Sequence, residues 1–294
     1  MQTPARIGFI GLGVMGEPMC RNLARKSGVP VTASDLDDAP LERLSVDGVT
    51  RAASLAALMK ECDVVFLSLP SGEVVWRLCH QTDGLLTHAR PGQIIVDLST
   101  SPVQTTRELA AAFEVRAATF IDAPVARTRA AAEAGTLAVM VGADPSTFSA
   151  VRPLLETFAT DVSLCGPVGC GQVLKILNNM VLFETIVAIS EAKAIGERSG
   201  VDPRVLFETL AKGSADSFAL RNHGMKAMLP GEFPERTFSV RYAHKDLMYA
   251  LQLAQATGVD ARAARVVERW FEQAIEAGHG DNYHPVISRL MAPD

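Results

Sequence analysis

A single lysine inside a long apolar stretch could carry out proton transfer. Most positions from 172 to 190 are apolar, and the only charged residues among them are Lys175 and Glu184. This pattern predicts a buried helix without a wide solvent face. Asn178 and Asn179 follow the lysine by three and four residues, so they share its helix face. Buried polar groups need partners, and we expect these side chains to converge on a polar cavity. A partly buried lysine suits acid–base chemistry at a carbonyl, and a solvated surface lysine is the alternative.

A glycine pattern near the N-terminus is typical of a dinucleotide-binding turn. Residues 11–16 read Gly-Leu-Gly-Val-Met-Gly and lie between a predicted strand and a predicted helix. The first glycine permits a tight turn, the second lets the backbone approach a pyrophosphate, and the third allows the helix to pack on the strand. The helix N-terminus then offers N–H groups and a positive dipole to the phosphates. A glycine turn that only packs on a sheet is the alternative.

Asp35 bears on the choice of nucleotide. It follows the second predicted strand, 19 residues after Gly16, close to the roughly 20-residue spacing of an acid that binds the ribose 2′-hydroxyl. A carboxylate accepts a hydrogen bond from NAD but repels the 2′-phosphate of NADP, and Asp37 and Asp38 add negative charge. We therefore predict NAD, with NADP disfavoured. An aspartate that only caps its loop is the alternative.

The elements that must position these residues fall into two halves. In the first half, apolar runs alternate with helical patterns, which favours a parallel sheet covered on both faces. The predicted strands are 7–10, 31–34, 64–69, 94–98, 119–122, 137–141 and 162–164. From 172 onward the patterns are helical only, around 172–198, 203–210, 244–257 and 261–277. We predict a doubly wound α/β domain over residues 1–165 and an all-helical domain over 166–294.

Composition excludes several classes of protein. The chain has 294 residues, 48% of them hydrophobic and 21% charged, as in ordinary soluble globular proteins. A formal charge of -5 without a basic stripe argues against a nucleic-acid partner. No stretch of about 18 uncharged apolar residues is evident, so we expect no membrane span. Five cysteines without a C-x-x-C pair, and a start unlike a signal peptide, predict a cytoplasmic protein. The six histidines lack paired metal-ligand spacing, so no metal site is predicted.

An N-terminal signature and five later motifs resemble the β-hydroxyacid dehydrogenase family, which includes 3-hydroxyisobutyrate dehydrogenase and tartronate semialdehyde reductase. The signature is residues 8–16 followed by Pro18-Met19 and Asn22-Leu23. The later motifs are Asp97-Leu98-Ser99-Thr100, Asp122-Ala123-Pro124-Val125, Gly135-Thr136-Leu137, Lys175 with Asn179, and Lys245-Asp246-Leu247. Together they cover essentially the whole chain. The resemblance implies a Rossmann-type domain, a long interdomain helix and an all-helical C-terminal domain that mediates homodimers or homotetramers.

The resemblance also implies roles for individual residues. Lys175 matches the family's catalytic acid/base, and Thr100 and Lys245 match residues that contact the cofactor. The segment after Asp122 and the asparagines beside the lysine hold the acid group of the substrate. The full set of predicted cofactor contacts is Gly11, Leu12, Gly13, Val14, Met15, Gly16, Asp35, Leu69, Pro70, Thr100 and Lys245. The predicted substrate contacts are Ala126, Arg127, Thr128, Asn178 and Asn179.

One motif departs from the family. Ser-Gly-Gly usually follows Asp-Ala-Pro-Val, whereas this chain has Ala126, Arg127 and Thr128. The planar guanidinium suits bidentate binding of a carboxylate, sulfonate or phosphate. A branch resembling sulfolactaldehyde reductase carries a similar Arg-Thr, but it has a serine where this chain has Leu182, so a sulfonate substrate does not follow. We predict that Arg127 pairs with the acidic end of the substrate, and a surface loop arginine is the alternative.

Two other functions stay open from the sequence. Imine reductases share the fold but generally lack the catalytic lysine, and a non-catalytic dinucleotide-binding sensor would not need the Lys175 cluster. We predict an NAD-preferring dehydrogenase that interconverts a small acidic β-hydroxy compound and its aldehyde or ketone.

Overall fold

The computed structural model describes residues 5–291 and divides the chain into two compact units. The boundary falls between Lys175 and Ile176, later than the boundary predicted between residues 165 and 166. It lies inside helix α9 (Cys170–Arg198). The first residues of α9 hydrogen-bond to loops of the first unit, so they belong to that unit.

The first unit holds, within the described residues, a nine-stranded and mostly parallel sheet. Its parallel part has the order β3-β2-β1-β4-β5-β6, β8 pairs antiparallel with β6 and β7, and β9 pairs parallel with β8. The strands are β1 (Ile7–Ile10), β2 (Val31–Ser34), β3 (Thr50–Arg51), β4 (Val64–Leu67), β5 (Ile94–Asp97), β6 (Thr119–Asp122), β7 (Val125–Ala126), β8 (Leu137–Gly142) and β9 (Ala159–Gly166). The doubly wound α/β prediction is confirmed. The two-residue strands β3 and β7 were not predicted.

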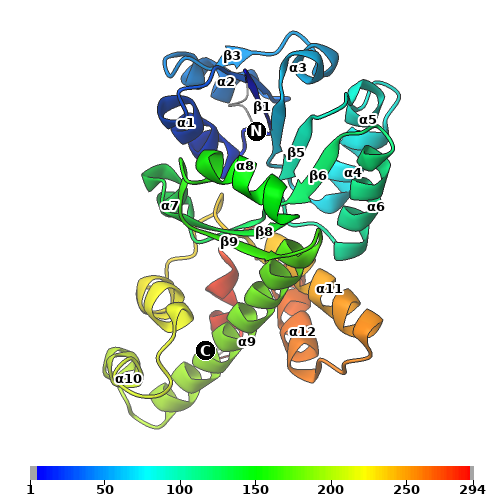
Figure 1. Cartoon of the computed structure of the whole chain (residues 1–294). Helices are drawn as coiled ribbons and strands as arrows, with labels where there is room; N and C mark the ends of the chain where they lie inside the picture. The colour runs from blue at the N-terminus through cyan, green and yellow to red at the C-terminus, as the bar shows by residue number, and fades with distance from the viewer. Residues whose placement is uncertain (1–4, 292–294) are drawn as a thin grey trace. The chain divides into compact units, whose positions relative to one another are not determined.

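Helices cover both faces of this sheet (Figure 1). Several begin at a polar residue whose side chain accepts a hydrogen bond from a backbone N–H of the first turn. These capping residues are Ser54, Ser71, Thr128 and Asp144. Helix α1 is different, because Met15 offers no side-chain cap to its first turn. The helices are α1 (Gly16–Lys26), α2 (Asp38–Ser45), α3 (Leu55–Glu61), α4 (Gly72–His80), α5 (Leu85–His88), α6 (Val103–Glu114), α7 (Arg129–Ala134), α8 (Pro145–Leu155) and the start of α9.

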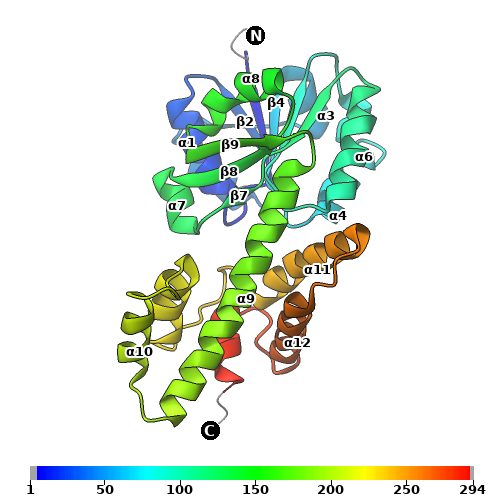
Figure 2. The same cartoon turned by 60° about the horizontal axis from the view of Figure 1, so that its bottom comes forward.

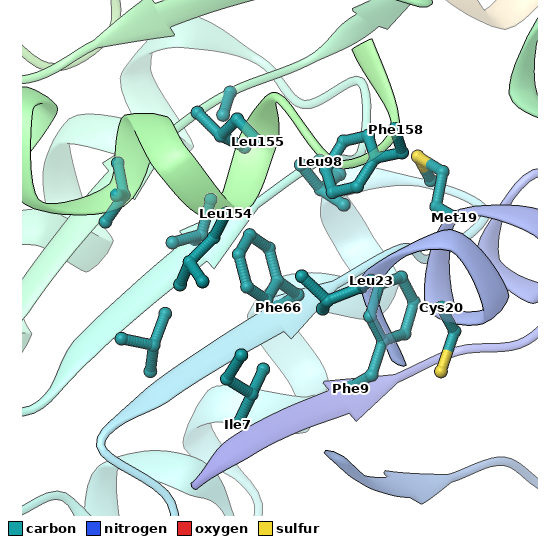
Figure 3. Close-up of a cluster of buried hydrophobic side chains, with 14 of the residues drawn as sticks. Ile7, Phe9, Met19, Cys20, Leu23, Phe66, Leu98, Leu154, Leu155 and Phe158 are labelled. Atoms are coloured by element: carbon teal, nitrogen blue, oxygen red, sulfur yellow. The ribbon is translucent and has the colours of Figure 1, made fainter. Parts of the chain in front are cut away.

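The sheet has a hydrophobic core on each face. Successive residues of a strand point to opposite faces, so Phe9 and Phe66 enter one core while Ile10 and Leu67 enter the other. Figure 3 shows the first core, where the rings of Phe9 and Phe66 stack with centroids 6.0 Å apart. The edge of the Phe158 ring meets Phe66 from the loop after α8. Packing on both faces explains why the central strands are apolar runs without polar alternation.

The second unit is helical, as predicted (Figure 2). It contains the remainder of α9, α10 (Pro203–Leu210), the π-helix η1 (Leu220–Met228), α11 (Val240–Thr257), α12 (Arg262–Glu276) and the 3₁₀ helix η2 (His284–Arg289). Its core includes Phe183 of α9, Phe207 of α10 and Phe271 of α12. Neither η1 nor η2 was predicted. Two isolated β-bridges also tie the segment before α11 to the segment before η2.

Two histidines lie inside the core of the second unit. His284 is fully buried among the rings of Phe183, Phe238 and Tyr283. His223 of η1 lies beside it, with ring centroids 5.3 Å apart, and its Nδ1 shares a hydrogen bond with the Tyr283 hydroxyl. In the described part of the chain, both ring nitrogens of His284 and the Nε2 of His223 have no hydrogen-bond partner. Both rings are therefore packed as neutral aromatic groups.

Helix α9 corrects one expectation. The sequence predicted no wide solvent face between residues 172 and 190, yet Leu174, Leu177 and Val181 are 46%, 37% and 56% exposed. Hydropathy alone does not separate a face buried in its own chain from one left open. In the described chain, α9 is also long and apolar enough to cross a membrane by length and composition. It contains Lys175 and Glu184, so it is not the uncharged apolar stretch that the sequence analysis looked for. One such helix is weak support for a span, because the core helix of a soluble protein has the same properties, and Phe183 and Ile186 lie in the core.

Candidate active site

The glycine turn has the geometry of a phosphate-binding loop. A Cβ atom at Gly11, whose φ is +94°, would clash with the Ser68 carbonyl, and one at Gly16 would clash with the Gly11 carbonyl. At Gly13, by contrast, a Cβ would meet nothing within 4 Å. Two glycines are thus required by the fold, and the middle one leaves open space for a ligand. Because α1 lacks a side-chain cap, its first backbone N–H groups can bind phosphate. The residues fit a dinucleotide.

Asp35 ties the end of β2 to the glycine turn. Its carboxylate accepts hydrogen bonds from the backbone N–H of Leu12 and from that of Asp37, the latter at 2.8 Å. The loop-capping contacts of the alternative interpretation are therefore present. The predicted hydrogen bond to a ribose stays a prediction, and the half-buried side chain lies at the carboxyl end of its strand, where such a ligand binds.

The loops after β4 and β5 are joined at the same edge of the sheet. The backbone N–H of Leu69 donates to the Ser99 hydroxyl at 2.9 Å. The buried carboxylate of Asp97 accepts from the N–H of Ser99 at 2.9 Å and from the hydroxyl of Ser101 at 3.0 Å. Thr100 lies between the two serines and is half-buried. The structure thus brings the loops that hold Leu69, Pro70 and Thr100 to the carboxyl ends of adjacent parallel strands, as it does the glycine turn.

The helix that carries Lys175 is fixed to the first unit at its start. Asp122 accepts hydrogen bonds from the backbone N–H of Gly169 at 2.7 Å and of Gln172 at 2.8 Å. The Gln172 carboxamide donates to the Ser99 carbonyl at 2.8 Å and accepts from the Ser101 N–H at 3.1 Å. Lys175 follows three residues later and is half-buried. Its position relative to the sheet is therefore set by buried hydrogen bonds.

Two carboxyl groups next to this helix are electrostatically unusual. Asp97 and Asp122 are register partners on β5 and β6 and are both fully buried. Burial raises the pKa of each carboxyl to about 6, although hydrogen bonds from neighbouring backbone and hydroxyl groups oppose the shift. Asp97 and Asp122 were recognised in the sequence as parts of motifs, but no role was predicted for either.

The predicted polar residues of the second unit meet around one buried carboxylate. Asn179 is 1% exposed and donates to Asp246 at 2.7 Å. Asn178 donates to the side-chain oxygen of Asn179 at 3.1 Å, and the Lys245 ammonium lies 3.1 Å from Asp246. The same ammonium lies near the rings of Tyr242 and Tyr249. Sequence reasoning missed Asp246 as a site residue, although its place beside Lys245 was a usable signal.

The loop of residues 126–128, whose sequence differs from the family motif, has an unexpected geometry. Arg127 has a φ of +87°, a left-handed conformation that favours the glycine usual at this place in the family. Its guanidinium donates to the Thr136 carbonyl at 2.6 Å, to Thr160 at 2.9 Å and to Asp161 at 2.6 Å. Thr128 caps α7, and Ala126 ends β7. A substrate acid would have to compete with Asp161 for this guanidinium, and the predicted anchoring role stays a prediction.

No group of three or more His, Cys, Asp or Glu side chains that could hold a metal ion occurs in residues 5–291.

Comparisons with known proteins agree with this geometry. Residues 6–166 match a family model described as the NAD binding domain of 6-phosphogluconate dehydrogenase. Residues 169–291 match one described as NAD-binding of NADP-dependent 3-hydroxyisobutyrate dehydrogenase. The chain is 32% identical over 280 residues to a 2-(hydroxymethyl)glutarate dehydrogenase of Eubacterium barkeri, covering 95% of this chain and 92% of that protein. It is 31% identical over 293 residues to an NAD-dependent L-serine dehydrogenase of Pseudomonas aeruginosa, covering 98% of each.

A solved structure is also close. The 3-hydroxyisobutyrate dehydrogenase of Mycobacterium tuberculosis, described with L-serine, has a TM-score of 0.88 at 33% identity and covers 99% of both chains. The fold and the glycine turn define an NAD(P)-dependent oxidoreductase. The chain belongs to the β-hydroxyacid dehydrogenase family. It transfers a hydride between NAD(P) and the CH–OH group of a small hydroxy acid. This activity replaces the imine reductase and sensor alternatives.

Proposed function

We propose that this enzyme is an NAD-preferring dehydrogenase of a small β-hydroxy carboxylic acid, with Lys175 as its general acid/base. The observation that carries the proposal is the buried hydrogen-bond network of Asp122 and Gln172. It fixes the helix turn bearing Lys175 against the loop bearing Thr100. A preorganised amine beside a cofactor loop is what proton transfer coupled to hydride transfer requires.

Each group of residues has its own role in the proposed reaction. A nicotinamide cofactor, when bound at the glycine turn, would supply the hydride acceptor for oxidation of the substrate carbon. Lys175 takes the proton of the substrate hydroxyl during oxidation and returns it during reduction. Asn178, Asn179 and the loop of Ala126, Arg127 and Thr128 hold the acid group, so that the reacting carbon is oriented.

The chemistry around Asp35 supports NAD. Asp35, Asp37 and Asp38 gather negative charge at the end of β2, which opposes a 2′-phosphate. Arg51 is the cation that pairs with Asp38, at 2.7 Å, so that arginine is already partly neutralised. The cofactor contacts in this proposal are the glycine turn, Asp35, Leu69, Pro70, Thr100 and Lys245.

We also propose a cytoplasmic homodimer or homotetramer. The apolar residues Leu174, Leu177 and Val181 form an exposed stripe along α9, which a second copy of the chain would cover. All five cysteines are free thiols, as expected in a reducing compartment.

A substrate panel tests the proposed function. L-serine, 3-hydroxyisobutyrate, 2-(hydroxymethyl)glutarate and a sulfonate analogue would each be oxidised with NAD⁺ and with NADP⁺ while reduced cofactor is monitored by absorbance. We expect the highest kcat/KM with a carboxylate substrate and NAD⁺. A preference for NADP⁺ across the panel would refute the assignment of Asp35, and turnover of the sulfonate alone would refute the carboxylate class.

A further inference from the structure

Gln172 joins the two segments on which the proposed chemistry depends. Its side chain is fully buried, and its carboxamide spans the backbone of Ser99 and Ser101 on either side of Thr100. Lys175 lies three residues further along the same helix. One amide group therefore links the loop assigned to the cofactor with the turn that carries the proposed acid/base.

Both segments are also anchored to the sheet without the Gln172 side chain. The loop is held by Asp97, which accepts from the Ser99 N–H and the Ser101 hydroxyl. The helix start is held by Asp122, which accepts from the backbone N–H of Gln172 itself. The first turn of the helix is also packed closely on β8, because a Cβ atom at Gly171 would clash with the Met140 carbonyl. Removal of the Gln172 carboxamide should therefore leave the fold intact. Only the distance between the Thr100 loop and the start of α9 should become variable.

The chemistry of the bridge requires an amide. The Ser101 N–H needs an acceptor and the Ser99 carbonyl needs a donor, and a carboxamide offers both on one planar group. A methionine has a similar length but makes neither hydrogen bond. A glutamate would accept from Ser101 but would place a further buried acid beside Asp97 and Asp122, whose carboxyl groups already resist ionisation.

We infer that Gln172 is a positioning residue, which sets the distance between Thr100 and Lys175 during hydride and proton transfer. This inference rests on the proposed function. Gln172 has no exposed surface with which to touch a ligand, so it acts through the two segments that it joins. A displacement of about 1 Å in a catalytic arrangement can cost about 10²-fold in rate.

The test compares Gln172→Met with Gln93→Met in the full-length enzyme. Gln93 is equally buried, and its carboxamide also bridges backbone groups, because it donates to the Met59 and Cys62 carbonyls at 2.8 Å each. It precedes β5, at the opposite end of that strand from Thr100. The readouts are kcat and KM for the panel compound oxidised fastest, the primary deuterium isotope effect on kcat, the dissociation constant of NADH and the melting temperature.

For Gln172→Met we expect kcat to fall by about 10- to 100-fold, with a larger isotope effect because hydride transfer becomes more rate-limiting. For Gln172→Met, NADH binding should stay within about threefold of the parent, and Gln93→Met should keep kcat within about threefold. A kcat for Gln172→Met within threefold of the parent would overturn the inference. Equal losses of kcat in both variants, in proportion to their melting temperatures, would also overturn it.

Two further variants keep the test decisive. If Gln172→Met does not fold, Gln172→Asn retains the amide on a shorter stem that cannot span both serines, and the same pattern is expected. Lys175→Ala, measured alongside, separates this inference from the proposed function. Full activity of Lys175→Ala would refute the proposed function, whereas an inactive Lys175→Ala beside a fully active Gln172→Met would refute only the positioning role.

Discussion

Acid should destabilise the helical unit through its two buried histidines. Burial lowers the pKa of His223 to about 4, with a smaller effect from Lys226, and lowers the pKa of His284 well below its usual value, with a smaller effect from His223. An unfolded imidazole titrates near 6.5. The pKa values of both histidines in the folded chain lie below that of the unfolded imidazole. The stability that the neutral rings contribute is therefore complete above about pH 6.5 and is lost as pH falls toward 4. At pH 4.5, His223 alone should cost about 2.7 kcal/mol, at about 1.4 kcal/mol per pKa unit.

The sheet unit should respond in the opposite direction. The pKa values of Asp97 and Asp122 are raised to about 6 by burial, above the value near 3.9 of an unfolded aspartate. Their contribution to stability is therefore complete below about pH 3.9 and is lost as pH rises through about 6. Between pH 6.5 and 4.5 the helical unit weakens while these carboxyl groups strengthen the sheet unit. Acid should separate the two unfolding transitions.

The chain's two tryptophans allow this to be measured unit by unit. Trp76 lies on α4 in the sheet unit, and Trp270 lies on α12 in the helical unit. Urea unfolding would be followed by fluorescence in Trp76→Phe and Trp270→Phe at pH 7.5 and 4.5. The Trp270 transition should move to lower urea at pH 4.5, and His284→Phe should remove about half of that movement, since it removes one of two titrating groups. His279→Gln serves as the matched control, because His279 is also in the helical unit but is only half-buried. An unchanged movement in His284→Phe would refute the destabilising role of His284.

Three further predictions concern single side chains. Asp35→Ala should weaken NAD⁺ binding by about 1.5–3 kcal/mol, the worth of a charged hydrogen bond, and should raise kcat/KM with NADP⁺ relative to NAD⁺; an unchanged cofactor ratio would contradict this role. Arg127→Ala should raise KM for acidic substrates but not for their neutral alcohol analogues, whereas equal losses would show that its bonds to Asp161 and Thr160 serve only the loop. Asp246→Ala should lower the unfolding free energy of the helical unit by about 1.5–3 kcal/mol, because Asn179 is left buried without its carboxylate partner, and urea unfolding of Trp76→Phe would detect it.

The sequence predicted best what depends on local chemistry. The apolar runs located the central strands because both faces of the sheet are covered. Gly11 and Gly16 make the tight turn and the close helix packing predicted for them. Contacts between residues far apart in the sequence could not be predicted. Arg127 binds Asp161 from a strand 34 positions later, and the edge strand β7 exists only because β8 pairs with it.

The open stripe on α9 and the buried histidines were missed for a related reason. Hydropathy reports that a residue is apolar or polar but not which surface covers it, so Val181 was expected to be buried. His284 lies in an aromatic core that only the packing of α9, η1 and η2 creates. Gln172 showed no pattern of its own, since its two partners are 71 and 73 positions away.

The most direct test of the central claim is the turnover number of Lys175→Ala, with NADH binding measured in the same preparation. We expect kcat to fall by about 10²- to 10⁴-fold, the usual contribution of an acid–base group, while the NADH dissociation constant stays within about threefold. A kcat within threefold of the parent enzyme would contradict the claim that Lys175 transfers the proton.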